Sequence, residues 1–484
     1  MGVLSNTRWV GLSQGTKIGA QVVGMVVLAR LLSPKEYGIM AMAAVVTNLA
    51  IVFRDMGSSA AIIQKQELSQ EVKTAVFWFN IAVGLLISLI VLATAPLMAG
   101  LFSTQELTPV LMLLALAFPL SSSSAVHQAL LERNSSFKTV ARIEISSIAT
   151  GLVIALGMAA TGFGVYSLVA QTLITVGLTS LQLWHASHWR PASLRKCSWS
   201  ELRSILGFSS HLVGFNVVNY LARNSDNIVV GRYFGQDVLG AYALAYRVML
   251  FPLQSLTFVV SRSLYPVLSR QQNQRPEMRR TYLTVVTVVA TLVAPMMGGM
   301  LVLRESFIQV FLGDGWELSS QLLFWLAPTG FIQSLLSTTG VVFMATGATR
   351  TLLVLGIVGA ILQIGAFVLG ANYGVLPMAK LYLVANVLNA IPVMALCMRQ
   401  LEGSWLDLLK PTLIPIASAI SMIVALVALD DLLSRSGDYG KVSIGALVGA
   451  LVYGTTYLMI GRRQAAALTS LARNRKRTPN KAED

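Results

Sequence analysis

Apolar runs of about 20 residues follow one another along the sequence, and short polar, Gly- or Pro-containing stretches separate them. A run of this length is what an α-helix needs to cross the hydrocarbon core of a bilayer. Helical structure is expected because a segment in lipid must satisfy its backbone hydrogen bonds internally. The pattern predicts an all-α polytopic membrane protein with about 14 transmembrane helices. The predicted helices cover residues 10–31, 38–58, 75–97, 107–126, 143–161, 164–184, 207–231, 239–260, 281–303, 320–345, 351–370, 374–397, 411–429 and 441–461.

The composition leads to the same class of protein. Of the 484 residues, 55% are hydrophobic and only 12% are charged, whereas soluble globular proteins carry about 25% charged residues. The longest polar stretches, at about 185–205, 262–280 and 462–484, are too short to build a core of their own. Any activity is therefore expected to lie among the helices.

The net charge of +15 would suggest a nucleic-acid partner in a soluble protein. If both termini are cytoplasmic, however, 27 of the 36 basic residues fall at cytoplasmic ends and loops, six at outer ones and three deeper in the helices. This asymmetry follows the positive-inside rule. It predicts an integral membrane protein with both termini in the cytoplasm and no nucleic-acid partner. The basic tail at 462–484 is expected to contact anionic lipids.

A short internal repeat relates the two halves. Residues 30–43 and 232–245 share Arg, Gly and two Ala at a constant offset of 202. Because six predicted helices separate them, the halves have the same orientation, as in transporters whose substrate site lies between two parallel lobes. The predicted parts are an N-terminal six-helix lobe (1–190), a second six-helix lobe (191–400), two additional helices (401–461) and the basic tail (462–484).

Several segments resemble the bacterial polysaccharide repeat-unit flippases of the colanic-acid and lipopolysaccharide exporter type. They are residues 28–38 (Leu-Ala-Arg-Leu-Leu-Ser-Pro-Lys-Glu-Tyr-Gly), 53–57 (Phe-Arg-Asp-Met-Gly), 62–64 (Ile-Ile-Gln), 226–232 (Asp-Asn-Ile-Val-Val-Gly-Arg), 240–242 (Gly-Ala-Tyr) and 265–270 (Tyr-Pro-Val-Leu-Ser-Arg). The resemblance implies the multidrug/oligosaccharidyl-lipid/polysaccharide exporter fold. It also implies a substrate, an undecaprenyl-pyrophosphate-linked oligosaccharide moved from the cytoplasmic to the periplasmic leaflet, and polysaccharide polymerase machinery as a further partner.

Polar residues inside the predicted helices are the candidate substrate-binding residues, because such groups are costly in lipid and usually face a wet cavity. In the first helix Gln14, Lys17 and Gln21 share one face. Lys17 is expected to meet an anionic headgroup. The alternative is that it extends to the nearby cytoplasmic surface.

The seventh predicted helix is the most polar. Its candidate stripe contains Asn216, Asn219, Tyr220 and Arg223, with Asp226 beside it. Substrate binding is one interpretation. The other is a structural ion pair between Arg223 and Asp226, which are three residues apart.

Arg247 lies near the centre of the eighth predicted helix, which contains no acidic residue, whereas Lys380 and Asn386 lie in the twelfth. Arg247 is expected either to bind a substrate phosphate or to pair with an acid from another helix. For Lys380 the alternative is extension to the outer surface. Lys17 lies in the inner half of the first helix, and together with the three deeper bases, Arg223, Arg247 and Lys380, it makes four candidate cations against one acid, Asp226. This balance suits a pyrophosphate better than a cationic drug.

No cofactor site or catalytic motif is expected. The sequence contains no nucleotide-binding Gly-rich loop, and His185 and His188 lie in a basic cytoplasmic loop that does not suggest a metal site. The favoured function is therefore a flippase that works by alternating access, with a coupling ion that the sequence does not identify. The alternatives are an ion-coupled drug antiporter of the same superfamily and a membrane polysaccharide polymerase.

Overall fold

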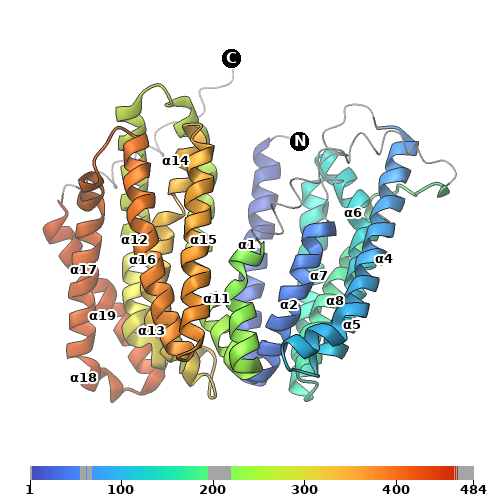
Figure 1. Ribbon diagram of the computed structural model, residues 1–484, viewed down its shortest axis with the longest axis horizontal. Helices are drawn as coiled ribbons and strands as arrows, with labels where there is room; N and C mark the ends of the chain where they lie inside the picture. Colours follow the sequence, from blue (N-terminus) through green and yellow to red (C-terminus); the bar gives the residue numbers. More distant parts are fainter. Residues whose placement is uncertain are drawn as a thin grey trace. The chain divides into compact units, whose positions relative to one another are not determined.

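The computed structural model describes residues 3–54, 62, 68–194, 220–462, 464 and 466. Every regular element in these ranges is a helix (Figure 1). The chain divides into two compact units, Met1–Ala243 and Leu244–Asp484. The all-α membrane fold predicted from the apolar runs is thus confirmed.

The first unit contains seven complete helices and the beginning of an eighth within the described ranges. They are α1 (Val3–Leu31), α2 (Pro34–Arg54), α4 (Gln70–Leu101), α5 (Leu107–Ala115), α6 (Ala117–Arg133), α7 (Phe137–Ala160), α8 (Val165–Ala186) and the start of α11 (Ser225–Arg270). The fourth predicted span is built from two pieces, because the chain is interrupted at Leu116 between α5 and α6.

The second unit begins inside α11 and continues through eight further α-helices. They are α12 (Arg275–Phe311), α13 (Glu317–Leu336), α14 (Thr339–Ala345), α15 (Thr349–Ala371), α16 (Val375–Gln400), α17 (Leu409–Ala428), α18 (Asp430–Ser434) and α19 (Gly437–Ile460), with the short 3₁₀ helix η2 (Trp405–Leu408) before α17.

Eleven of the 14 predicted spans are helices that are long and apolar enough to cross a membrane. The other three are residues 10–31, 207–231 and 239–260. They correspond to α1, to a segment that lies mostly outside the described residues, and to part of α11. These are the spans in which the sequence places the first two groups of candidate residues and Arg247. Of these, α1 carries Gln14, Lys17 and Gln21 among its apolar residues, a composition that suits a helix facing a wet cavity.

The predicted repeat reappears in the helix packing. In the first unit α4 packs on α6, α6 on α8, and α7 on α8. In the second unit α12 packs on α13, α13 on α16, and α15 on α16. Three packing contacts among helices three to six of the first lobe therefore recur among helices nine to twelve of the second.

Small residues set the distance between several of these helices. Gly84 of α4 lies against Ser122 of α6, and Gly151 of α7 lies against Thr175 of α8. In lipid, helices gain little hydrophobic free energy from association, so close van der Waals packing at small residues stabilises the bundle instead. The sequence places such residues at the helix contacts.

The segments that carry the repeat also contact each other within the first unit. The chain leaves α1 and enters α2 at Ser33 and Pro34, and at an offset of 202 the non-helical residue inside α11 is Gly235 (φ 80°). Gly38 packs against the backbone of Gln236, and Gly240 packs against the backbone of Pro34. A side chain on either glycine would overlap the opposite backbone, so this crossing requires glycine on both sides.

The two additional helices, α17 and α19, pack directly on α12. Tyr453 donates a hydrogen bond to the carbonyl oxygen of Thr291 at 2.9 Å, and the Thr291 hydroxyl donates to the Tyr457 hydroxyl at 3.2 Å. Met422 and Leu426 of α17 are buried in the same cluster. The two helices are therefore built into the second unit.

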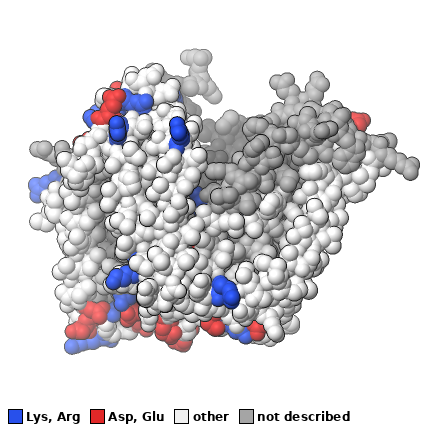
Figure 2. Space-filling model, in the orientation of Figure 1, with Lys and Arg blue, Asp and Glu red and all other residues white. Residues whose placement is uncertain are grey.

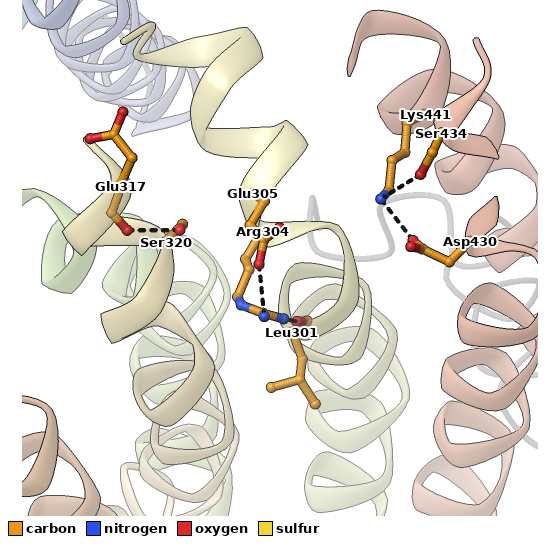
Figure 3. Close-up of polar contacts among 8 residues, drawn as sticks. All are labelled: Leu301, Arg304, Glu305, Glu317, Ser320, Asp430, Ser434 and Lys441. Atoms are coloured by element: carbon orange, nitrogen blue, oxygen red, sulfur yellow. Dashed lines mark hydrogen bonds and ion pairs between the residues drawn. The ribbon is translucent and has the colours of Figure 1, made fainter. Parts of the chain in front are cut away.

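The end of the second unit that the charge pattern assigns to the periplasm carries paired charges (Figure 3). Arg304 lies 2.9 Å from Glu305, and Lys441 lies 2.7 Å from Asp430. On the face drawn in Figure 2, acidic side chains gather at the lower left, where Figure 1 shows α18. Glu305 and Asp430 thus pair with two of the six basic residues that the sequence prediction places on the outer side.

Candidate substrate-binding surfaces

The polar face of α1 is partly open, and one of its members is already paired. Gln14 and Gln21 are exposed. The Lys17 ammonium lies 2.8 Å from a carboxylate oxygen of Glu144 in α7, and the Ser13 hydroxyl donates to the other oxygen at 2.6 Å. The side chains of Lys17 and Glu144 are 37% and 23% exposed. An anion could therefore reach Lys17, but it would compete with a carboxylate.

Glu144 is a residue that the sequence interpretation missed. It stands at the beginning of the predicted helix 143–161, and residue spacing within one helix cannot identify a partner on another. The packing of α1 on α7 brings the two charges together. The balance of deep charges is thus less positive than the sequence count suggests.

Of the predicted stripe before and within α11, Asn216 and Asn219 lie outside the described residues. The Tyr220 hydroxyl donates to the carbonyl oxygen of Val45 in α2 at 2.9 Å. Arg223 is exposed. Tyr220 therefore has a structural contact, while Arg223 is available to a ligand.

Asp226 does not form the alternative ion pair with Arg223 in the described structure. Its side chain is buried, with 2% exposed. One carboxylate oxygen accepts a hydrogen bond from the Tyr242 hydroxyl at 3.0 Å, and the other accepts from the backbone N–H of Asn227 at 2.7 Å. Asp226 thus ties together the two parts of α11 on either side of Gly235.

In the second unit Arg247 is exposed, and within the described part of that unit it forms no ion pair. The preceding residue, Tyr246, belongs to a polar network. The Tyr246 and Tyr382 hydroxyls are 3.3 Å apart, and the Gln333 amide donates to the Tyr382 hydroxyl at 2.6 Å and to the Asn386 side-chain oxygen at 3.2 Å. α11, α13 and α16 therefore meet at a polar cluster, and Arg247 directly follows one of its members in the sequence.

Asn386 and Lys380 have different surroundings although both are in α16. Asn386 is fully buried and donates to the Tyr382 carbonyl oxygen at 2.8 Å. Lys380 is exposed, and its ammonium lies 5.7 Å from the centre of the Trp325 ring. Asn386 thus supports the polar network, and Lys380 makes a cation–π contact.

Gln333 and Tyr382 are further network members that the sequence interpretation did not select. Gln333 stands in an otherwise apolar stretch of α13, so the rule that identified Gln14 and Gln21 could have found it. Tyr382 has a largely apolar ring, and the sequence around it in α16 does not distinguish it as a polar residue. Its role follows only from the packing of α16 on α13.

Comparison with known proteins agrees with this architecture. Residues 27–321, more than half of the chain, match the family described as "Polysaccharide biosynthesis protein". The chain belongs to this family. Polysaccharide biosynthesis proteins of similar sequence include the succinoglycan biosynthesis transport protein ExoT of Rhizobium meliloti, 27% identical over 98% of this chain and 96% of that protein. The lipopolysaccharide biosynthesis protein WzxC of Escherichia coli is 24% identical over 80% of this chain and 79% of its own.

Two solved structures share the fold of this family member. The lipid II flippase MurJ in an inward closed conformation aligns with a TM-score of 0.71 and 16% identity, over 95% of this chain and 99% of MurJ. A multidrug resistance MATE family transporter of the MOP superfamily, in an inward-facing conformation, aligns with a TM-score of 0.55 and 18% identity, over 83% and 95% of the two chains. The predicted exporter fold is thus confirmed.

Proposed function

We propose that this protein is a flippase that moves an oligosaccharide linked to undecaprenyl pyrophosphate from the cytoplasmic to the periplasmic leaflet of a bacterial inner membrane. Alternating access of the two six-helix lobes would expose the substrate site to each side in turn. The observation that carries the proposal is the match to the polysaccharide biosynthesis protein family over residues 27–321. Relatives named for succinoglycan and lipopolysaccharide biosynthesis support the substrate class.

The accessible cations suit the anionic part of such a substrate. Arg223 and Arg247 are exposed, and their planar guanidinium groups can bind two phosphate oxygens at once. Lys17 could bind phosphate only after the phosphate displaces Glu144. The exposed amides of Gln14 and Gln21 can bind sugar hydroxyl groups or phosphate.

The proposed setting includes both termini in the cytoplasm, anionic lipids near the basic tail, and polysaccharide polymerase machinery as the recipient of the product. An ion gradient or the membrane potential would supply the energy. The orientation rests on the distribution of basic residues.

A drug antiporter is the second candidate, because a MATE transporter shares the fold. A site for cationic drugs would need an accessible carboxylate. Among the described candidate residues, Asp226 is buried and accepts a hydrogen bond from Tyr242, and Glu144 is paired with Lys17. These contacts favour an anionic substrate. A drug-susceptibility assay separates the two functions.

The direct test is deletion of the gene in its own host. We expect lipid-linked repeat units to accumulate in the inner leaflet and surface polysaccharide to fall, with drug susceptibility unchanged. The wild-type gene supplied on a plasmid should restore export. Normal export in the deletion strain, or a change in drug susceptibility alone, would contradict the proposal.

A further inference from the structure

A groove of about 500 Å³ lies between the beginning of α7 and the end of α8, away from the residues discussed above. Its polar lining comes from both helices. Thr139, Arg142 and Ser146 are on α7, and Gln182, His185 and His188 are at the end of α8 or just after it. None of the described residues that line the groove is acidic. The lining therefore offers hydrogen-bond donors and a permanent positive charge.

Neighbouring side chains place the groove at the level of lipid headgroups. The Lys138 ammonium and the Arg142 guanidinium lie 5.3 Å and 5.9 Å from the centre of the Trp9 ring in α1. Trp residues flanked by basic side chains are typical of the boundary between hydrocarbon and water. By the charge distribution, this end of α7 faces the cytoplasm. The groove thus opens toward the inner leaflet.

The end of α8 that carries the two histidines is held in place by several contacts. The Ser187 hydroxyl and the buried His127 ring nitrogen are 2.6 Å apart. The Trp184 indole donates to the Ser123 carbonyl oxygen at 3.0 Å, and the Trp189 indole donates to Gln70 at 2.8 Å. Between Ser187 and Trp189, His188 has a left-handed backbone conformation (φ 54°). A fixed backbone reduces the entropy lost when a ligand binds.

The lining of the groove is partly polar and partly apolar. Ser146 donates to the Gln182 side-chain oxygen at 2.9 Å, which links the two helices. Ile143 and Ala186 also line the groove, and they pack in an apolar cluster with Leu183. A ligand with an anionic head and an apolar body matches such a mixed lining.

We propose that this groove binds the phosphate group of an anionic lipid in the inner leaflet. Arg142 would donate its paired N–H groups to two phosphate oxygens, and His185 and His188 would donate from the other wall. All three side chains are exposed. The lipid is either a membrane phospholipid such as phosphatidylglycerol or a polyprenyl phosphate. The proposal does not depend on which substrate the protein transports.

The test measures lipid binding to the purified full-length protein by native mass spectrometry. Three lipids are titrated: phosphatidylglycerol, undecaprenyl phosphate and the zwitterionic phosphatidylcholine. We expect one of the anionic lipids to bind more tightly than phosphatidylcholine, and Arg142→Gln to weaken that binding roughly fivefold. The double variant His185→Gln/His188→Gln should weaken it further when combined with Arg142→Gln.

Arg350→Gln is the matched control, because Arg350 is also exposed and stands near the beginning of α15, the counterpart of α7 in the repeat. It should leave lipid affinity unchanged. Thermal unfolding of each variant verifies that the fold is intact. If Arg142→Gln weakens only the binding of phosphatidylglycerol, the groove is a phospholipid site. If it weakens only the binding of undecaprenyl phosphate, the groove is a carrier-lipid site. Equal binding by wild type and Arg142→Gln, or an equal loss in Arg350→Gln, would overturn the proposal.

Discussion

Two basic side chains of the proposed substrate surface differ in their surroundings. Lys17 shares its charge with Glu144 at 2.8 Å, whereas Arg247 is exposed and has no ion pair in the described part of its unit. Removing either side chain takes away one positive charge, but only removal of Lys17 also leaves a carboxylate without its ion-pair partner. The two substitutions are therefore expected to differ in their effects on folding and on transport.

Arg247→Ala should leave membrane insertion and protein level near those of wild type, because no ion pair in the described second unit depends on this side chain. Transport should fall roughly ten- to hundredfold through loss of charge-assisted hydrogen bonds to phosphate. Arg247→Lys should recover only part of the transport, since an ammonium group keeps the positive charge but cannot bind two phosphate oxygens as a planar guanidinium does. Complementation of a flippase-deficient strain, with immunoblots of membranes, measures both effects. Full transport by the Ala variant would exclude the phosphate role.

The Lys17–Glu144 pair can be tested by a double-mutant cycle of transport and of thermal stability. If Lys17 binds phosphate, Lys17→Met abolishes transport and Glu144→Gln largely preserves it, because the competing carboxylate is gone. Since the pair is partly exposed, each single variant should lose about 1 kcal/mol of stability or less. If the double variant recovered the transport that Lys17→Met loses, Lys17 would be structural.

At the scale of helices, the contact between α2 and α11 combines the sequence repeat with a steric requirement. Gly38 faces the backbone of Gln236, and Gly240 faces the backbone of Pro34. Gly157 in α7 differs from these two glycines. No atom lies within 4 Å of the position that a Cβ atom would occupy there. The same substitution at two glycines can thus separate steric overlap from helix propensity.

Gly240→Ala should destabilise the purified protein by about 1–3 kcal/mol, because the added methyl group must push two backbones apart. Gly157→Ala is the control, and it should be neutral or stabilise the protein by up to about 1 kcal/mol through helix propensity. Thermal unfolding in detergent measures both. Equal midpoints for the two variants would show that the crossing tolerates a side chain.

Much of the helix pattern could be predicted from the sequence, because the apolar length of a span depends only on the bilayer. The repeat could also be recognised in the sequence, since it includes Gly38 and Gly240, and close backbone contact requires glycine at both positions. The pairing of Lys17 with Glu144, and of Asp226 with Tyr242, could not be predicted. The first depends on how α1 is rotated against α7, and the second on how the chain bends at Gly235 within α11. A single sequence contains no direct signal for either geometry.

At the scale of the whole molecule, the distribution of charge determines the orientation in the membrane. Reporter fusions after residues 195, 270 and 470 should report the cytoplasm, and fusions near 104, 313 and 435 should report the periplasm. Alkaline phosphatase and green fluorescent protein fusions provide opposite signals at each site. A periplasmic signal at 270 would reverse the assignment of the second half.

The reciprocal contact of Gly38 with Gln236 and of Gly240 with Pro34 has the form of an isologous interface, in which each of two copies offers the same patch to the other. Such an interface is expected of a homodimer whose gene was duplicated and fused. At the offset of 202, the position of Arg247 is Val45 in the first half, and that of Lys17 is Asn219 in the second. A homodimer would have to carry each cation twice or not at all. A single chain that contains both halves can instead carry each of these charges once, and so can bind an asymmetric ligand.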